Sequence, residues 1–534
     1  MKKIILATFV LICTNLLFAN NVKITNVALK NDSTLTFKVS WENSWRIQAN
    51  PGNHDAVWIF IKWEECAVPT QWNHLKLKNT GYYAAPPLEA KMPADRVGLM
   101  VQRSGYGNGN IVNDSVAVQF NLLGAGAYNF RVFGIEMVYV PQDSFYLGDL
   151  GYTNWSFCKW NGTSNFSQPY LINSDTLRIG AITTGNHLGV AGSSFTLGTG
   201  VSVKIPNTYP NGYSASYCMK YEITRAEWVA FLNTITSVQA NTMLPDFYNQ
   251  TLASRNYHFR VTGIYPAYTT DYPFRAADGL DPLKCFSYLD WCGLRPMTEL
   301  EFEKFARGRQ YPVPYSYPWG NTLATQTSTF TNWKTNSEKM SNTVPIGYGA
   351  IHCNRTFNIT DTIGTTIRGG FNGSTGSTRL TIGAGYWGIL ELAGNQGEAV
   401  VPLLTQIQGA PTMLFCNRFN KYSHGDGSIA ASTGYYNDTN WVNTFGTPGT
   451  SYFFGAVSAT TKWRVNMRGG KWCTNLIPSG TVGDSYQISY RGDLYQVGVN
   501  TGTNVSVHVN TANNERNYAN FASYMTRGVR TANF

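Results

Sequence analysis

After residue 310 the sequence is dominated by turn-forming residues, and no apolar periodicity persists long enough to predict an extended helix. The chain has 534 residues, which is too many for one ordinary hydrophobic core, so we expect two or more domains. Regular helices and sheets alone cannot hold so much irregular chain. We therefore expect bound metal ions or disulfide bonds to stabilise the loops.

Short strands are predicted between about residues 22 and 133. Leu35 to Val39 alternates apolar and polar side chains, whereas Val57 to Ile61 is a nearly continuous apolar run. Similar short segments lie at 22–24, 97–101, 116–122 and 128–133, separated by Gly, Asn and Pro. This pattern predicts an all-β sandwich over residues 20–133.

Three short helices are predicted in the remainder, residues 134–534. Thr224 and Thr298 each stand three residues before a glutamate, which is the capping-box pattern of a helix start. Pro282 to Trp291 is the third helix, with Gly293 placed to end it. The predicted fold class is α+β: an all-β sandwich followed by a loop-rich domain.

The first nineteen residues are typical of a cleavable secretion signal. Lys2 and Lys3 precede an apolar run from Ile4 to Phe18, and Ala19 ends a plausible cleavage site. The run is too short for a membrane span, which needs about 20 apolar residues. Cys13 follows Ile12 instead of a small residue, so no lipid anchor is predicted. We expect a secreted or cell-surface bacterial protein, periplasmic or extracellular, without membrane insertion.

Charge and cysteine content exclude several classes of protein. The formal net charge is +10, but the basic residues are scattered, so no nucleic-acid partner is expected. Nine cysteines include Cys13, and no two are spaced as CxxC, so a zinc ribbon or thioredoxin-type site is not supported. Export permits disulfide bonds, but their pairing cannot be deduced from the spacing.

Seven segments, in order, resemble motifs of the formylglycine-generating enzyme (sulfatase-modifying factor) family. Tyr317 to Asn321 matches that family's Y-P-W-G-N, and Gly388 to Asn395 is similar to G-L-Y-D-M-A-G-N. The other five segments are Ile135 to Pro141, Tyr221 to Thr224, Leu294 to Phe302, Arg468 to Trp472 and Arg527 to Arg530. The resemblance implies a divergent secreted member with a loop-rich, C-type-lectin-like domain over residues 134–534.

The resemblance also tests the family's chemistry. Its enzymes oxidise a substrate cysteine with copper held by two cysteines, and soft thiolates suit Cu(I). The equivalent positions are Thr474 and Ser479, with Cys473 one residue from the first and no cysteine after it. Copper is therefore not expected, and Cys473 is a catalytic candidate only if the protein is a divergent oxidase. The seven histidines show no iron-binding spacing.

The resemblance further implies a structural calcium site. Carried over residue by residue, the ligands are Glu391, Gly394, Gln396 and Glu398, with the glycine and glutamine contributing backbone carbonyls. Calcium prefers such oxygen donors. The alternative is a tight turn with two solvated glutamates.

We predict a non-catalytic, lectin-fold binding or surface-structural protein. Residues 410–520 are rich in Tyr, Trp, Asn and Thr, which suits a glycan or protein ligand, and Trp472 and Arg491 are the candidate ligand-binding residues. Two alternatives stay open: a divergent copper-dependent oxidase, and a self-assembling scaffold subunit of a bacterial envelope secretion, gliding or filament machine.

Overall fold

The structure is a computed structural model. It describes residues 21–149, 151, 156–160, 168–180, 186–190, 202–245, 259–353, 365–373, 377–405, 413–414, 423–437, 463–470, 486–491, 493–497, 507–508 and 524–534. In this part of the chain strands dominate and four helices are present, so the predicted β-rich α+β class is confirmed. The predicted signal at 1–19 lies outside the described residues.

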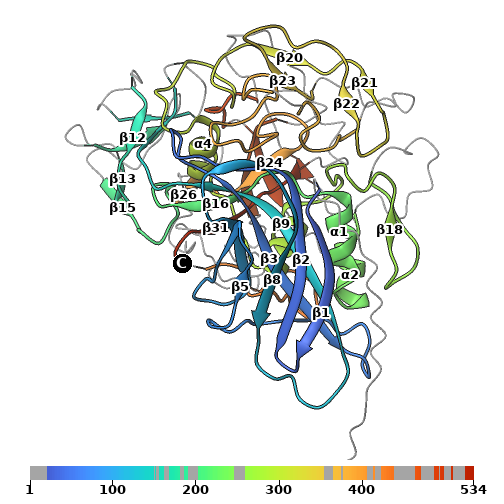
Figure 1. Ribbon diagram of the computed structural model, residues 1–534. Coiled ribbons are helices and arrows are strands. Elements are labelled where there is room, and N and C mark those ends of the chain that lie inside the picture. Colours follow the sequence, from blue (N-terminus) through green and yellow to red (C-terminus); the bar gives the residue numbers. More distant parts are fainter. Residues whose placement is uncertain are drawn as a thin grey trace, which may run out of the picture.

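The first sheet is built from the N-terminal segment. Its order is β1 (Lys23–Asn31), β2 (Thr34–Arg46), β8 (Gly107–Gln119) and β5 (Tyr83–Ala84), all antiparallel. In Figure 1 these strands run side by side in the lower half of the molecule. The alternating segment predicted at 35–39 is the start of β2, with its apolar side chains buried.

An eight-stranded sheet joins the N-terminal segment to the rest of the chain. Its order is β19 (Arg295–Pro296), β31 (Gly528–Thr531), β16 (Ser216–Met219), β9 (Tyr128–Val140), β3 (Asp55–Glu65), β7 (Leu99–Arg103) and β6 (Leu88–Lys91), and β4 (Asn73–His74) pairs with β3. The predicted boundary between residues 133 and 134 lies inside β9, which pairs with β3 continuously from Tyr128 to Val138. The division into two domains stays a prediction, although its two parts share this sheet.

Strand β3 is buried on both faces, which accounts for its nearly continuous apolar sequence. Val57 and Ile59 belong to a hydrophobic cluster shared with β2 and β8. Trp58 and Phe60 belong to a second cluster shared with the helices, where the ring centroids of Phe60 and Trp291 are 5.0 Å apart. The eight-stranded sheet is thus a middle layer between a second sheet and the helices.

The helices begin where the capping boxes predicted. Helix α1 (Arg225–Leu232) and α4 (Glu299–Arg307) have threonine caps whose hydroxyls accept from the third helical N–H, and α3 is Pro282–Trp291. A fourth helix, α2 (Ser237–Met243), was not predicted, although Thr236 and Gln239 form the same reciprocal cap.

The remaining strands form small sheets. The largest is β29 (Val507–His508), β28 (Asp493–Val497), β27 (Trp463–Arg468), β24 (Gly397–Val400) and β30 (Tyr524–Met525), and another has the order β11 (Phe157–Lys159), β14 (Leu188–Val190), β13 (Leu177–Gly180) and β15 (Ser202–Ile205). The paired strands are β10 (Phe145–Leu147) with β12 (Tyr170–Ile172), β17 (Val261–Thr262) with β18 (Thr269–Thr270), β20 (Ala324–Gln326) with β23 (Gly349–Ile351), β21 (Phe330–Thr331) with β22 (Lys339–Met340), and β25 (Leu404–Thr405) with β26 (Met413–Leu414).

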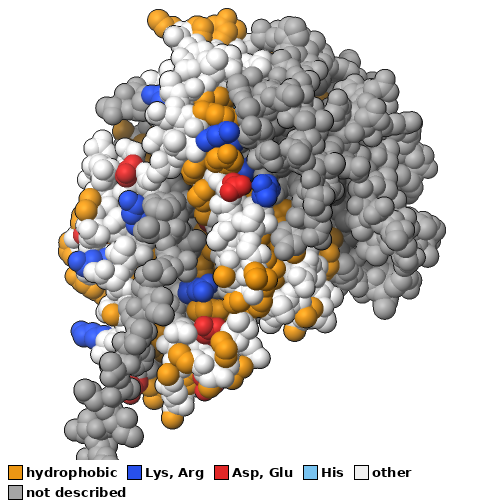
Figure 2. Space-filling view, turned by 90° about the vertical axis from the view of Figure 1, so that its right-hand side faces the viewer, with side chains coloured by type: hydrophobic (Ala, Val, Ile, Leu, Met, Phe, Trp, Pro, Cys, Tyr) orange, Lys and Arg blue, Asp and Glu red, His pale blue; other side chains and the backbone are white. Residues whose placement is uncertain are grey.

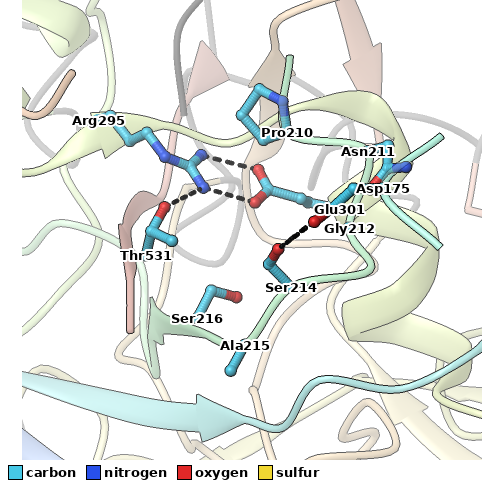
Figure 3. A pocket seen from close by; sticks show the side chains of 10 residues that line it. All are labelled: Asp175, Pro210, Asn211, Gly212, Ser214, Ala215, Ser216, Arg295, Glu301 and Thr531. Atoms are coloured by element: carbon cyan, nitrogen blue, oxygen red, sulfur yellow. Dashed lines mark hydrogen bonds and ion pairs between the residues drawn. The ribbon is translucent and has the colours of Figure 1, made fainter. Parts of the chain in front are cut away.

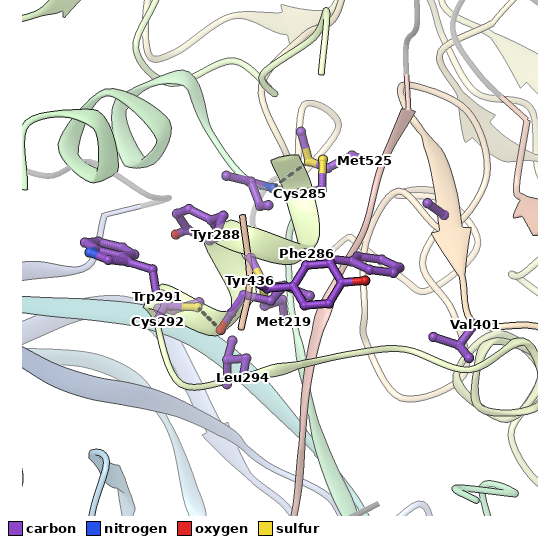
Figure 4. Close-up of a cluster of buried hydrophobic side chains, with 14 of the residues drawn as sticks. Met219, Cys285, Phe286, Tyr288, Trp291, Cys292, Leu294, Val401, Tyr436 and Met525 are labelled. Carbon is purple, nitrogen blue, oxygen red and sulfur yellow. Dashed lines mark hydrogen bonds between the residues drawn. The ribbon is translucent and has the colours of Figure 1, made fainter. Parts of the chain in front are cut away.

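Helix α3 is the centre of the larger core (Figure 4). Its side chains Cys285, Phe286 and Tyr288 lie among Met219 of β16 and Met525 of β30. All ten residues of the helix are buried. A helix that is covered on every side needs its own polar groups paired, and the Asp281 cap accepts from the Lys284 N–H at 2.9 Å.

The surface is sparsely charged, as the composition predicts. On the face drawn in Figure 2, lysine and arginine side chains lie apart from one another among hydrophobic and uncharged polar ones. No helix in the described part of the chain combines the length and apolar character needed to cross a membrane.

Truncating a side chain of the middle layer should lower stability strongly. Ile59 is fully buried, whereas Ile346 is fully exposed. Ile59→Ala should lower the free energy of unfolding by about 2–5 kcal/mol because a cavity replaces packed methyl groups. The matched change Ile346→Ala should shift it by less than about 0.5 kcal/mol. Urea denaturation measures both, and equal losses would contradict the two-sided burial of β3.

Candidate functional site

The loop that carries the predicted calcium ligands has a constrained backbone. Glu391 and Asn395 adopt left-handed conformations with φ of 51° and 57°, and Gly394 has φ of 81°. A Cβ on Gly394 would lie 2.6 Å from the carbonyl oxygen of His352, so only glycine fits against β23 and the residues after it. The loop is therefore held in one tight shape before β24 begins.

Two of the four predicted ligands contact the guanidinium of Arg527, and a third, Gln396, is bonded to the neighbouring Glu222. The Nε of Arg527 lies 2.5 Å from Glu398 Oε1, and its Nη2 donates to the carbonyl oxygen of Glu391 at 2.9 Å. Gln396 is tied to the same cluster through Glu222, whose Oε1 accepts from the Gln396 N–H at 2.9 Å. Gly394 donates its N–H to Gly469 at 2.8 Å. The predicted turn with two solvated glutamates is wrong, because Glu391 and Glu398 are buried.

The cluster has more negative than positive charge. Glu222, Glu391 and Glu398 face one fully buried arginine, Arg527, and these four groups sum to a formal charge of −2 when all are ionised (three minus one). The half-buried Arg368 also acts to lower the pKa of Glu391. Burial raises the pKa of Glu391 to about 7, and it also raises the pKa values of Glu222 and Glu398, while Arg527 opposes these shifts. These carboxylates need either protons or a further cation near neutral pH.

The oxygen atoms of this cluster that lack a hydrogen-bond partner in the described ranges suit calcium in donor type. Glu391 Oε2, Glu398 Oε2 and Gln396 Oε1 are buried without hydrogen-bond partners among the described residues. One divalent ion would balance the formal charge of −2. No group of three or more His, Cys, Asp or Glu residues in the described part of the chain is arranged to hold a metal. The predicted ligands fit calcium in the type of their oxygen donors alone, and calcium binding stays a prediction.

Arg491, a predicted ligand-binding residue, is enclosed. Its Nε and Nη2 donate to the two carboxylate oxygens of Glu299 on α4 at 2.7 and 2.8 Å, and its guanidinium lies 4.0 Å from the ring centroid of Phe157. Glu299 also accepts from Asn466 at 2.7 Å. A ligand would have to displace this ion pair to reach Arg491. Trp472, the other predicted ligand-binding residue, lies outside the described residues.

Several cysteines and His352 in the described part of the chain are buried. Burial raises the pKa of Cys158 to about 12 and moves Cys218 and Cys292 in the same direction, so these thiols stay protonated. The imidazole of His352 lies between Thr327 Oγ1 and the carbonyl oxygen of Thr365, each at 2.8 Å. Cys473 lies outside the described residues, so the oxidase alternative is untested.

One enclosed cavity near α4 is too small for an organic ligand (Figure 3). Its volume is about 10 Å³. Arg295 forms two hydrogen bonds to Glu301, at 2.9 and 2.6 Å, and a third to Thr531 at 3.3 Å. Ser214 donates to Asp175 at 3.0 Å on the other side. These polar groups join α4 to β31 and are structural.

A much larger cavity, which we call the seam pocket, opens where the N-terminal strands meet β9, β16 and the C-terminal residues. Its volume is about 440 Å³, within the range of about 300–1,000 Å³ typical of small-molecule sites. It is lined by Arg46 at the end of β2, His54, Glu89 and Lys91 of β6, Gln102 of β7, Tyr106, Tyr139 of β9, Tyr217 of β16 and Phe534, among others.

The wall of the seam pocket is pre-positioned by cross-strand pairs. Tyr139 and Tyr217 are paired across β9 and β16, and Glu89 is paired with Gln102 across β6 and β7. Gln102 Oε1 accepts from the Tyr217 hydroxyl at 2.7 Å and lies 3.0 Å from His54 Nε2, while its Nε2 donates to Glu89 at 2.8 Å. The sequence did not reveal this site, because its residues come together only through strand register.

Comparison with known proteins adds no family assignment. No protein-family model matches the sequence, and no curated protein matches it. The likeness to the formylglycine-generating enzyme family therefore depends on the seven segments alone.

Deprotonation of Glu391 should make the calcium-free protein less stable as the pH rises. Its folded pKa of about 7 lies above the ordinary value of 4.5, so this stabilisation is complete below about pH 4.5 and is lost as the pH rises through about 7. Glu391→Gln should remove on the order of 1–3 kcal/mol of this dependence. Thermal melts between pH 5 and 8 with chelator measure it.

The exposed Glu42→Gln is the matched control and should keep the wild-type pH dependence. Melting curves of Glu391→Gln that follow the wild type at every pH would show that Glu391 does not titrate in this range.

Proposed function

We propose that the protein is a secreted or cell-surface, non-catalytic binding protein that captures a glycan. The observation that carries this proposal is the contrast between two kinds of site. The seam pocket is open, of ligand size and lined by aromatic rings with amide and charged groups. The acidic and basic groups of the family-like segments are buried and paired with one another.

The proposal includes the finer fold expected from the sequence. The N-terminal segment would be a β-sandwich, and the remainder a formylglycine-generating-enzyme-like domain of the C-type-lectin type without its copper chemistry. Support comes from the positions of the motifs. Glu303 of α4 accepts from Arg468 at 2.7 Å and from Arg307 at 3.0 Å, so the R-G-G segment and the helix capped by Thr298 are bound to each other. Such pairs stabilise loops and present no free base or nucleophile.

Calcium would have a structural role in this protein. Glu391 and Glu398 would supply carboxylate oxygens, with backbone carbonyls from Gly394 and Gln396. The ion would hold the loop between β23 and β24 against the segment that contains Arg527, because Arg527 already contacts both glutamates. No reaction step would involve it.

A glycan array tests the proposed function directly. The purified protein should bind a defined subset of glycans, and binding should weaken when a chelator removes calcium because the loops lose their fixed positions. Heat-unfolded protein is the control for adhesion of exposed apolar surface. Failure to bind any glycan would contradict the proposal and favour protein binding or assembly, which size-exclusion chromatography would reveal as large complexes.

Millimolar calcium should raise the Tm of the purified protein by several degrees. A ligand present at a hundred times its Kd stabilises the folded state by about 2.7 kcal/mol. The double variant Glu391→Gln with Glu398→Gln should lose this shift, whereas Glu42→Gln should keep it. Scanning calorimetry with calcium, magnesium and chelator measures the effect. An identical Tm with calcium and with chelator would exclude the calcium site.

A further inference from the structure

The seam pocket has an excess of one positive charge. Arg46 Nη1 lies 2.8 Å from Glu89 Oε1, and Lys91 Nζ lies 3.2 Å from Glu89 Oε2, so two cations share one carboxylate. Hydrogen bonds from Gln102, Arg46 and Lys91 outweigh the effect of burial and lower the pKa of Glu89. Burial lowers the pKa of His54 to about 4, so this imidazole is neutral at pH 7. The side chains that line the pocket therefore carry a formal charge of +1.

The opposite wall is aromatic. The rings of His54 and Tyr139 are stacked with centroids 4.6 Å apart, Tyr139 and Tyr217 are 5.2 Å apart, and Tyr217 and Phe534 are 5.7 Å apart. Tyr106 stands at the rim and is 65% exposed. Aromatic faces pack against C–H groups, while phenol hydroxyls donate and accept hydrogen bonds. This wall suits a flat ring that is apolar on its faces and hydroxylated at its edge.

Three buried polar groups hold the wall of the seam pocket in a fixed arrangement. His54, Gln102 and Tyr217 are 6%, 3% and 2% exposed, and they are hydrogen-bonded to one another. Their mutual contacts fix the side chains before any ligand arrives, which lowers the entropic cost of binding. The hydroxyl of Tyr139, by contrast, has no hydrogen-bond partner among the described residues and remains for a ligand.

We propose that the seam pocket binds an acidic saccharide, in which each hydroxylated ring carries one carboxylate, as in a uronic acid. The carboxylate would balance the excess charge of Arg46 and Lys91, and a sugar ring would lie against Tyr139, Tyr217 and Phe534. A neutral sugar would leave the excess positive charge of the lining side chains unbalanced. This inference rests on the proposed glycan-binding function.

The carboxylate is tested with trigalacturonic acid and its methyl ester, in which a methyl group on each carboxylate removes its charge. Isothermal titration calorimetry should show that the wild type binds the free acid about tenfold more tightly than the ester, as expected for one charge-assisted hydrogen bond. Lys91→Met should remove most of this difference and leave the affinity for the ester unchanged. Lys30→Met, at an exposed lysine of β1 away from the pocket, should match the wild type.

The aromatic wall is tested at its exposed rim, where a substitution leaves the fold intact. Tyr106→Ala should weaken binding of the acid and of the ester to the same extent, by about threefold to tenfold. Tyr83→Ala is the matched control, because Tyr83 is 55% exposed on β5 and does not line the pocket. Circular dichroism melts of all four variants confirm that each is folded.

Equal affinity of the wild type for the acid and the ester would overturn the proposed ligand charge. Unchanged affinity in both Lys91→Met and Tyr106→Ala would overturn the proposed location. No measurable binding of trigalacturonic acid would overturn the inference itself. The glycan array decides the proposed function separately: array binding that survives in both pocket variants would retain the function and reject the seam pocket.

Discussion

The burial of β3 on both faces is the constraint on which the rest of the structure depends. Val57 and Trp58 are neighbours in sequence, yet they point into two different hydrophobic clusters. Apolar area buried on each face contributes roughly 25 cal/mol per Å², so β3 is stabilised by contacts on both of its faces. Neither the first sheet nor the helical layer can be removed without exposing one of these faces. The N-terminal segment is therefore an integral layer of the molecule.

Buried ion pairs perform the second structural task, which is to hold irregular chain. Arg275 with Glu338 (2.6 Å), Arg225 with Asp278 (3.2 Å) and Arg527 with Glu398 (2.5 Å) each join segments far apart in sequence. Breaking one member of such a pair costs about 3–5 kcal/mol, because the other charge stays buried. Only 13% of the residues are charged, yet several of them are buried. There they stabilise loops that have few backbone hydrogen bonds of the kind found in helices and sheets.

Sequence reasoning succeeded where structure is decided locally. The helix that Thr298 caps and the strand predicted at Val57 to Ile61 follow from hydrogen bonds and side-chain patterns close in sequence. The continuity of β9 through residues 133 and 134 could not be predicted, because it depends on pairing with β3 and β16. The burial of Glu391 was also missed, since its partner Arg527 lies 136 residues away. Motif spacing identifies such residues without revealing their protonation or neighbours.

The seam pocket follows from the same sheet that joins the two parts of the chain. Its aromatic wall exists because Tyr139 is in register with Tyr217, and its charged wall exists because Glu89 is in register with Gln102. Tyr139 and Tyr217 belong to the neighbouring strands β9 and β16, whereas Glu89 and Gln102 belong to β6 and β7 at one edge of the sheet. Strand β3 lies between these two strand pairs, so the pocket is complete only when the eight-stranded sheet has formed. A ligand that bridges the two walls would stabilise that junction by its binding free energy, so recognition and assembly of the middle layer are thermodynamically coupled.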